Sequence, residues 1–403
     1  MDTSKMKLFE AFSTEKNFSV LTEVEEVRRL TNNVFESMET SLVRNQILEA
    51  LEEYDLGTIK EVYEIFGGYI NRSFGIYSER DGRRNEYFVR KYKKGITEKE
   101  ILFEHSLIDF SVVNGLSIAA RLIPARDGRT FVKKSEGSNG SQSVNYFAVY
   151  EYLAGEDKYT WDNPIMNDEE YASAAEVMAL FHNASRNFDP KGLERIEPKI
   201  LEFLPTLPDV YQGFAQLECT SKFHRYYLKN LAEILEVIQR TQIPEEAVAQ
   251  MPYNPCHNDF HPGNLKFLEN KAVGIFDFDW SKIELRLFDV SLAMTYCCSS
   301  WSDQEDGTLL LDKCSIFLNS YQRKLVEIGE LEPLNTIEIE YLPIMMAAAN
   351  LYLINWDVTA YYDGTNLNDY EYLAYLQHNV RLMKWIEAHK PEISEMAKSA
   401  KSV

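Results

Sequence analysis

Residues 255–280 restrict the fold of this 403-residue chain more than any other segment. An aspartate, Asp259, is followed five residues later by Asn264, and then by two short apolar runs that polar residues 269–270 separate. Two such runs around a polar turn predict a β-hairpin whose second strand ends at Asp277. Because a hairpin returns its ends to the same place, we expect Asn264 and Asp277 to lie side by side, with Asp259 on the loop before them.

These three side chains have complementary chemistry. Mg²⁺ prefers hard oxygen ligands, so the amide oxygen of Asn264 and the carboxylate of Asp277 are suitable for holding it. The second carboxylate, Asp259, is left to accept a proton from an attacking hydroxyl group. The segment therefore predicts a metal site beside a catalytic base, with Asp259 as the base and Asn264 and Asp277 as metal ligands.

The order of these residues is that of the protein-kinase catalytic loop H-R-D-x-x-x-x-N followed by D-F-G. The motif H-x-D-F-H-P-G-N is closer to that of small-molecule kinases than to that of protein kinases. The chain resembles the aminoglycoside phosphotransferase family, which includes choline and homoserine kinases. The resemblance runs from about residue 48 into the C-terminal helices and is strongest over residues 256–293. It departs from D-F-G at Asp279, which stands where protein kinases have glycine. It implies an ATP- and Mg²⁺-dependent transfer of the γ-phosphoryl group to a small hydroxylated molecule, with His257 and Asp289 structural.

Patterning along the chain predicts an α+β, bilobal protein-kinase-like fold. Apolar residues at helical spacing mark residues 20–55, and short Tyr-, Phe- and Val-rich runs from 59 to 92 indicate an antiparallel meander with a turn at Asp81-Gly82. A helix over 98–113 and strands near 120–124 and 146–150 follow, around a polar loop that begins at residue 133. We expect mainly helices after residue 155. The predicted division is a helical extension at 1–45, a β-rich N-lobe at 46–154 and a helical C-lobe at 155–403.

The family resemblance implies a nucleotide site in the N-lobe. Gly68, Asn71 and Ser73 correspond to the turn that covers the phosphates. Arg90 stands where protein kinases have a phosphate-binding lysine, and alternation along a strand puts Lys91 on the opposite face, so that only one of the two points toward the nucleotide. We favour Arg90.

Two further positions complete the implied nucleotide site. Glu104 matches the helix glutamate that would pair with Arg90. The segment from Glu151 to Leu153 resembles the hinge, whose backbone groups and aliphatic side chains would hold the adenine.

The acceptor is the least constrained part of the prediction. Trp356, Asp357, Tyr361 and Tyr362 recur at near-helical spacing in a predicted wall helix, and aromatic rings beside an acid can hold an ammonium group by a cation–π contact. We assign Trp356 and Asp357, with Asp279, to the acceptor, although such spacing is also typical of a plain core. A cationic acceptor such as choline or an aminoglycoside fits this assignment, and homoserine or a sugar stays open.

The composition of the chain limits which classes of binding partner and which cellular compartment we expect. Forty-two Lys and Arg against 63 Asp and Glu leave a net charge of −21, which disfavours nucleic acid and anionic membranes as partners. Five cysteines without a C-x-x-C pair and the absence of a long apolar run indicate a reduced, cytoplasmic protein with no membrane span. Monomer and homodimer both stay open.

Two other functions fit parts of the sequence. His257, Asp259 and His261 alternate as metal ligands of a hydrolase would, but no other histidines of the chain stand at ligand spacing. A nucleotide-binding pseudokinase usually lacks one catalytic residue, whereas this chain keeps the full set.

Overall fold

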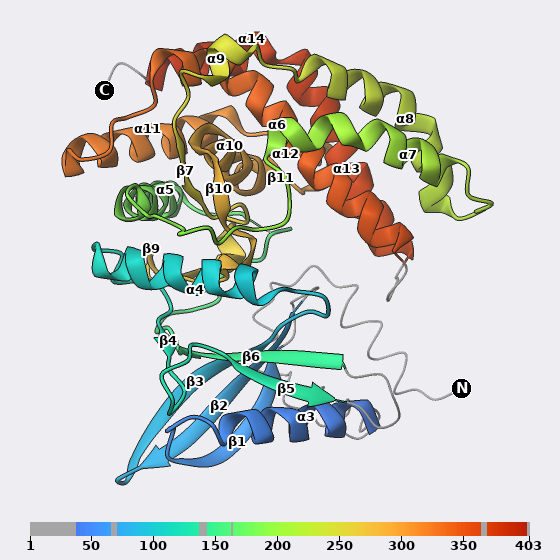
Figure 1. The fold of residues 1–403 in the computed structure, drawn as a ribbon. Coiled ribbons are helices and arrows are strands. Elements are labelled where there is room, and N and C mark those ends of the chain that lie inside the picture. The colour runs from blue at the N-terminus through green and yellow to red at the C-terminus, as the bar shows by residue number, and fades with distance from the viewer. Residues whose placement is uncertain (1–37, 66–70, 137–142, 163, 364–368, 401–403) are drawn as a thin grey trace. The chain divides into compact units, whose positions relative to one another are not determined.

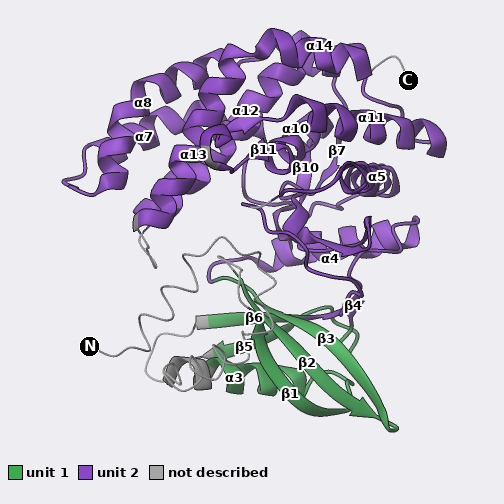
Figure 2. Ribbon diagram, turned by 180° about the vertical axis from the view of Figure 1, so that it is seen from behind, with its two compact units in different colours: residues 1–93, 124–148 green, residues 94–123, 149–403 purple. Residues whose placement is uncertain are grey.

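The computed structural model describes residues 38–65, 71–136, 143–162, 164–363 and 369–400, and it divides into two compact units (Figure 2). The first consists of residues 1–93 and 124–148, and the second of residues 94–123 and 149–403. Residues 1–37 of the predicted N-terminal extension and Gly68 lie outside the described residues. Residues 94–123, which belong to the predicted N-lobe, cluster with the second unit. The predicted boundary at residue 154 stays a prediction.

The first unit is an antiparallel sheet with one helix (Figure 1). Its strands follow the order β1-β2-β3-β6, and β5 pairs with the first part of β6. The elements are α3 (Met38–Leu51), β1 (Thr58–Ile65), β2 (Arg72–Arg80), β3 (Arg83–Lys91), β5 (Val132–Glu136) and β6 (Ser143–Glu151), whose last residues belong to the second unit. This unit is the β-rich part of the predicted α+β fold.

The predicted meander is confirmed, and so is its turn. Asp81 and Gly82 both have positive φ, 52° and 72°, as the two central residues of a tight hairpin turn require. At the far end of β3 from the turn, Lys91 donates from Nζ to Oε1 of Gln46 on α3, at 2.7 Å. Lys91 therefore contacts the helix of its own unit.

The polar composition of residues 133–143 predicts a loop, and that prediction is wrong for residues 133–136, which belong to β5 (Val132–Glu136). This strand pairs antiparallel with β6 from Val132 opposite Phe147 to Glu136 opposite Ser143. The strand carries Lys, Lys, Ser and Glu, so sequence propensity disfavours it, and only pairing with β6 explains it.

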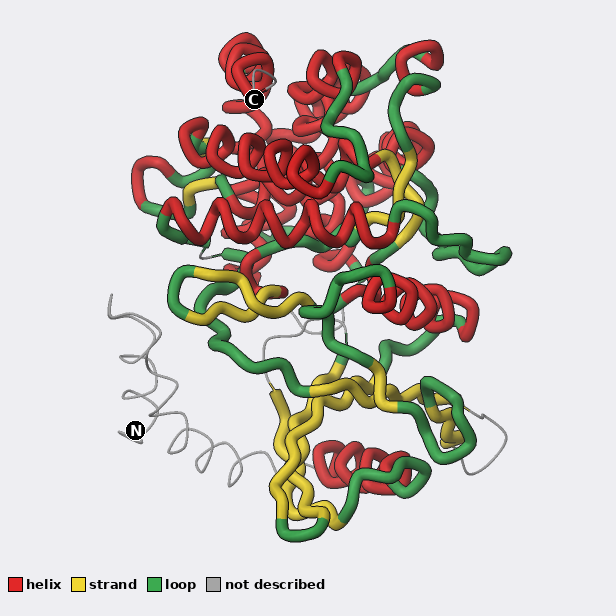
Figure 3. Tube along the Cα trace, turned by 90° about the vertical axis from the view of Figure 1, so that its left-hand side faces the viewer, coloured by secondary structure: helices red, strands yellow, loops and turns green. Residues whose placement is uncertain are grey.

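The second unit is mainly helical (Figure 3). The predicted helices over 98–113, 169–183, 222–241, 287–298, 308–328, 337–361 and 370–389 are confirmed, with ends that differ by at most three residues. Their bounds are α4 (Glu98–Val113), α5 (Asp168–Ser185), α8 (Lys222–Arg240), α10 (Arg286–Cys297), α11 (Leu311–Ile328), α12 (Thr336–Tyr362) and α13 (Asp369–Ala388). Shorter helices not predicted are α6 (Ile200–Phe203), α7 (Leu207–Ala215), α9 (Glu245–Val248) and α14 (Lys390–Ala400).

Small strand pairs interrupt the helices of this unit. They are β7 (Tyr253–Cys256) with β10 (Lys282–Leu285), β8 (Leu265–Leu268) with β9 (Lys271–Ile275), β11 (Ser299–Ser300) with β12 (Thr308–Leu309), and β4 (Leu122–Ile123) with the end of β6. The first two pairs carry the predicted catalytic segment, so its backbone is held by hydrogen-bonded strands on both sides.

Helix α12 runs through the core of the second unit, where α10 and α13 pack against it. By length and composition alone it could cross a membrane, with a mean hydropathy of 1.3 over its most apolar window. However, 72% of that window is buried inside the protein. A buried pair between Arg286 at the start of α10 and Glu338 on α12, with Nη2–Oε2 at 2.5 Å, further ties the helix into the unit. We therefore interpret α12 as a core helix.

Candidate active site

The predicted hairpin after the catalytic loop is confirmed. Leu265 pairs with Ile275 across β8 and β9, and Glu269 has a positive φ of 55° at the predicted turn. The main-chain N–H of Phe276 donates to the carbonyl of Asn264, at 3.2 Å. Asn264 is therefore adjacent to the end of the second strand, where Asp277 follows, and the two predicted metal ligands are neighbours.

Asp259 is half-buried at the start of this arrangement, and three side chains surround its carboxylate. The side-chain amide nitrogen of Asn264 donates to Oδ2 of Asp259 at 3.1 Å and to the main-chain carbonyl of Asp259 at 2.8 Å. The hydroxyl of Tyr296 on α10 donates to Oδ1 at 3.2 Å, and Nε2 of His261 lies 3.6 Å from Oδ2. These contacts orient the carboxylate that is predicted to accept a proton.

The oxygen donors present at this site fit Mg²⁺. Since Nδ2 of Asn264 is used by Asp259, the amide oxygen is the atom of that side chain left for a cation. Asp277 is half-buried and adds a carboxylate, and both are hard oxygen ligands of the type that Mg²⁺ takes in proteins. The site thus has the donor chemistry that the predicted metal needs.

The backbone is strained at both ends of this site. Asn258, next to Asp259, has φ 58°, and Asp277 has φ 66° and ψ 57°. Left-handed conformations are uncommon for residues other than glycine, and they cluster at functional sites where the surrounding structure enforces them. The two strained residues flank the predicted chemistry.

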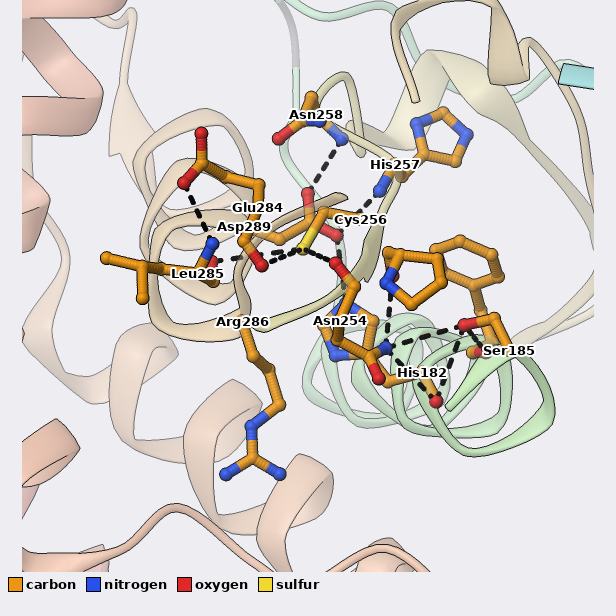
Figure 4. Close-up of polar contacts among 12 residues, drawn as sticks. His182, Ser185, Asn254, Cys256, His257, Asn258, Glu284, Leu285, Arg286 and Asp289 are labelled. Carbon is orange, nitrogen blue, oxygen red and sulfur yellow. Dashed lines mark hydrogen bonds and ion pairs between the residues drawn. The ribbon is translucent and has the colours of Figure 1, made fainter. Parts of the chain in front are cut away.

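Asp289 of α10 holds the catalytic loop in this conformation (Figure 4). Its two carboxylate oxygens accept the main-chain N–H groups of His257 and Asn258, each at 2.8 Å. Nε2 of His182, from α5, lies 2.9 Å from Oδ2 of Asp289. Burial raises the pKa of Asp289, but the hydrogen bond and charge of His182 and the contacts with His257 outweigh it, so that the pKa falls below its usual value. The structural role predicted for Asp289 agrees with this geometry.

His257 is fully buried beneath the catalytic loop and stabilises the conformation of that loop. Its Nε2 donates to the carbonyl of Phe276 at 3.0 Å, which links the catalytic loop to the end of β9. Burial lowers its pKa, which favours the neutral ring. This agrees with the structural role that we predicted for His257.

A metallohydrolase site is not supported. Across the described ranges, the one group of three metal-ligating side chains is His182, Cys256 and Asp289, not the alternating set around Asp259. Burial raises the pKa of the Cys256 thiol well above its usual value, which disfavours the thiolate form that binds metals. Cys256 instead donates to the carbonyl of Asn254 at 3.3 Å.

The predicted nucleotide residues of the first unit lie on neighbouring strands. Ser73 on β2 pairs directly with Arg90 on β3, so the two side chains share one face of the sheet. Arg90 is buried, at 3% exposure, whereas Lys91 faces α3 on the other side. Asn71 accepts the main-chain N–H of Lys93 through Oδ1, at 2.9 Å. Strand alternation thus separates Arg90 from Lys91 as predicted, and the phosphate role stays a prediction.

The remaining predicted nucleotide residues belong to the second unit. Glu104 is buried on α4, where the hydroxyl of Tyr150 donates to its Oε1 at 2.9 Å. Glu151 ends β6 and is exposed, and its N–H donates to the carbonyl of Arg121 at 2.8 Å. That N–H is therefore not available to adenine, which leaves the other backbone groups of the segment. Leu153 is half-buried against the β8–β9 hairpin, near Gly274.

Trp356 belongs to a cluster of aromatic rings in the second unit. Its ring centroid lies 5.7 Å from that of Tyr372, 6.1 Å from Trp161 and 6.3 Å from Tyr375. Rings this close contact each other directly, so they resemble a packed core more than an open cage.

Asp357 and Asp279 are both buried, at 1% and 7% exposure. Oδ2 of Asp357 accepts from Nδ2 of Asn379 at 2.8 Å, and burial raises its pKa well above the usual value, which favours the neutral carboxyl. The assignments of Asp279, Trp356 and Asp357 to the acceptor stay predictions. The neutral form of Asp357 that burial favours is unsuited to attracting a cation.

Sequence reasoning missed two residues at the site. Tyr296 reaches Asp259 from α10, and Arg195 donates from Nη1 to the carbonyl of Asp279 from an irregular segment before α6. No spacing signal identifies either residue, because both come from elements distant in sequence from the motif they contact.

Comparisons with known proteins agree with this arrangement. Residues 62–323, more than half of the chain, match the phosphotransferase enzyme family. The homoserine kinase of Ralstonia nicotianae is 25% identical over 292 residues, which cover 70% of this chain and 77% of the relative. The family resemblance of the sequence motifs is confirmed.

Solved structures give the same fold. A microcompartment-associated aminopropanol kinase superposes with a TM-score of 0.62 at 15% identity, covering 87% of this chain and 98% of that one. A spectinomycin phosphotransferase, solved with ADP and its substrate, has a TM-score of 0.55 at 15% identity and covers 89% and 98%. The predicted bilobal kinase-like fold class is confirmed. The chain is a small-molecule kinase and belongs to the phosphotransferase enzyme family.

Proposed function

We propose that this protein transfers the γ-phosphoryl group of ATP to a hydroxyl group of a small molecule that also carries an amine, with Mg²⁺ as the metal. The observation that carries the proposal is the convergence of Asp259, Asn264 and Asp277 at the ends of one hairpin. It supplies one carboxylate for a proton and two oxygen ligands for a cation.

Asp259 is the proposed general base. Its carboxylate is half-exposed and is oriented by Tyr296 and Asn264, so a substrate hydroxyl can approach it while its direction stays fixed. Removing the proton as the hydroxyl attacks is worth roughly 10²–10⁴-fold in rate.

Asn264 and Asp277 are the proposed ligands of the Mg²⁺ that accompanies ATP. When bound, the metal neutralises negative charge that develops on the transferring phosphoryl group. Arg90 and Ser73, side by side on the sheet of the first unit, are the proposed phosphate contacts, and Glu104 is the proposed partner of Arg90. Placement of ATP in this chain follows the family and is part of the proposal.

Two observations support an acceptor that carries an amine: the substrates named for the relatives and the net charge of the chain. Homoserine, aminopropanol and spectinomycin, the substrates in the names of the reported relatives, all carry both a hydroxyl and an amine. A protein with a net charge of −21 attracts such cationic groups at long range.

A coupled assay that follows ADP release tests this function. The purified chain is incubated with ATP, Mg²⁺ and a panel of homoserine, amino alcohols, aminoglycosides and neutral sugars. We expect acceptor-dependent ADP release with at least one amine-bearing alcohol, and its loss in Asp259→Asn. Binding of ATP without turnover of any acceptor would instead favour a pseudokinase.

A further inference from the structure

Tyr150 connects the strand that leads into the predicted adenine segment with the helix that carries Glu104. It lies on β6, one residue before Glu151, and is buried at 4% exposure. Its hydroxyl donates to Oε1 of Glu104 on α4 at 2.9 Å, and both residues belong to the second unit. The hydrogen bond therefore joins two elements of one compact unit.

His105, the next residue of α4, contacts the same hydroxyl. Its Nε2 lies 3.4 Å from the Tyr150 oxygen, and the two rings meet edge to face with centroids 6.1 Å apart. A hydroxyl has one proton, and Tyr150 donates that proton to Glu104, so its oxygen is the acceptor for an Nε2 proton of His105. Glu104 and His105 are 2% and 1% exposed, so water does not compete for these contacts. Two consecutive residues of α4 thus fix the direction of one hydroxyl.

Segment 118–123 connects the end of β6 to the end of β9. Leu122 pairs with Tyr150 on one side of the segment. On the other side, Ile275 exchanges two main-chain hydrogen bonds with residues 118 and 120, at 3.0 and 3.1 Å. Ile275 is the last residue of β9, two positions before Asp277. The strand that carries Tyr150 and the strand that leads to the proposed metal ligand are therefore bonded to the same segment.

We propose that Tyr150 is a positioning residue for phosphoryl transfer: its hydroxyl holds the Glu104 carboxylate in the orientation that pairs with Arg90, and so orients the phosphates of ATP. This inference rests on the proposed function and adds a residue to its nucleotide site. A glutamate side chain has three rotatable bonds, so a hydrogen bond from a buried, rigid ring selects one of its rotamers. A carboxylate is planar, so a bond that fixes Oε1 also restricts where Oε2 lies.

Two other roles for Tyr150 have different consequences. A direct contact between its ring and the adenine would affect every adenine compound equally, with or without phosphates. A purely structural hydroxyl would contribute to stability and leave nucleotide affinity unchanged. A positioning role affects only those compounds that carry phosphates.

The test compares ATP with adenosine, which carries the same base and ribose but no phosphates. Tyr150→Phe removes only the hydroxyl, and we expect the Kd of ATP in the presence of Mg²⁺ to rise roughly tenfold, as loss of a hydrogen bond to a charged group would give. The Kd of adenosine should stay unchanged. Glu104→Gln keeps the shape of the side chain and removes its charge, so adding Tyr150→Phe to it should weaken ATP binding no further. Calorimetric titration measures these affinities.

Tyr171→Phe is the matched control. Tyr171 lies on α5 of the same unit, is 2% exposed and donates from its hydroxyl to the carbonyl of Pro164 at 3.2 Å. The variant loses a buried tyrosine hydrogen bond, so it should lower the melting temperature and leave both affinities unchanged.

Three results would overturn the inference. They are an unchanged ATP affinity in Tyr150→Phe, equal losses for ATP and adenosine, and full additivity of Tyr150→Phe with Glu104→Gln. These binding measurements require no turnover, so they decide the role of Tyr150 whether or not an acceptor is phosphorylated. If ATP binds as expected and no hydroxylated acceptor is phosphorylated, the proposed function fails while the role of Tyr150 in ATP binding stands.

Discussion

The hydroxyl of Tyr296 donates to the carboxylate of Asp259 across 3.2 Å, from a helix that begins 27 residues after the base. This bond fixes the direction of the carboxylate, and the bond from Asn264 fixes it from the other side. The proposed base is therefore held by one residue of its own motif and one residue outside it.

Tyr296→Phe tests the first of these contacts. The ring stays, so packing against His261 at 5.2 Å between centroids is retained, while the hydrogen bond is lost. A hydrogen bond to a charged group is worth about 1.5–3 kcal/mol, so kcat should fall by roughly 10–100-fold. KM for ATP serves as the internal control and should stay unchanged. Wild-type kcat in the variant would show that the contact does not orient the base.

Asp259→Asn and Asp277→Asn should separate the base from the metal ligand. Loss of the base should lower kcat by roughly 10²–10⁴-fold while ATP still binds. Loss of the ligand should in addition weaken binding of Mg²⁺·ATP. Calorimetric titration of ATP with and without Mg²⁺ measures the difference. Equal nucleotide affinity in wild type and Asp277→Asn would contradict the metal assignment.

Asp289→Asn should destabilise the second unit as well as the catalytic loop. An amide cannot accept both main-chain N–H groups, which leaves a buried donor without a partner, so we expect a loss of about 2–5 kcal/mol in the free energy of unfolding. Because the pKa of Asp289 is lowered in the folded state, its contribution is present above the usual aspartate pKa and disappears as pH falls through the lower folded value.

Urea unfolding at several pH values measures this loss. The difference between wild type and Asp289→Asn should be full at neutral pH and should shrink under acid. The exposed Asp209→Asn on α7 is the control and should change stability little at any pH. A difference that does not depend on pH would mean that the carboxylate charge is not what stabilises the loop.

Asp357→Asn distinguishes a core residue from an acceptor contact. Burial raises the pKa of the folded group and so favours its neutral form, whereas the unfolded chain ionises it near its usual value. Stability is therefore lost as pH rises above that usual value, by about 1.4 kcal/mol per pH unit until the folded pKa is reached. The neutral amide should raise the melting temperature at pH 7, with the gain vanishing below the usual aspartate pKa. An acceptor contact would instead raise the KM of a cationic acceptor.

Arg90 and Glu104 are predicted to act as a pair that positions the phosphates. If so, the effects of Arg90→Ala and Glu104→Ala on kcat/KM should be non-additive in the double variant, since removing either residue already releases the other. Lys91→Ala is the matched control on the opposite face of the same strand. Strict additivity, or a loss seen only in Lys91→Ala, would move the role away from this pair.

The motif predicted the local geometry of the site because its residues are close in sequence. A hairpin is determined by its turn and its apolar runs, so the spacing of these residues is enough to predict that Asn264 and Asp277 are neighbours. The long helices were predictable for the same reason, since each carries its own periodic pattern.

What could not be predicted depends on contacts between distant segments. Arg195 reaches Asp279 across 84 residues, and Tyr296 reaches Asp259 across 37. The strand Val132–Glu136 exists only through its pairing with β6. The burial of Asp357 likewise depends on helices that no local pattern positions. Tertiary packing decided these features, and local propensity carried no information about them.

The hydrogen bonds that Asp289 accepts from the catalytic loop also bear on when this loop can reach its folded shape during synthesis. Asp259, Asn264 and Asp277 all leave the ribosome before Asp289 does, because the chain is synthesised from its N-terminus. Until α10 emerges, the strained backbone at Asn258 lacks the carboxylate that accepts its N–H. We expect a nascent chain stalled before residue 286 to carry the whole motif without its working shape, so that the catalytic loop matures late in translation.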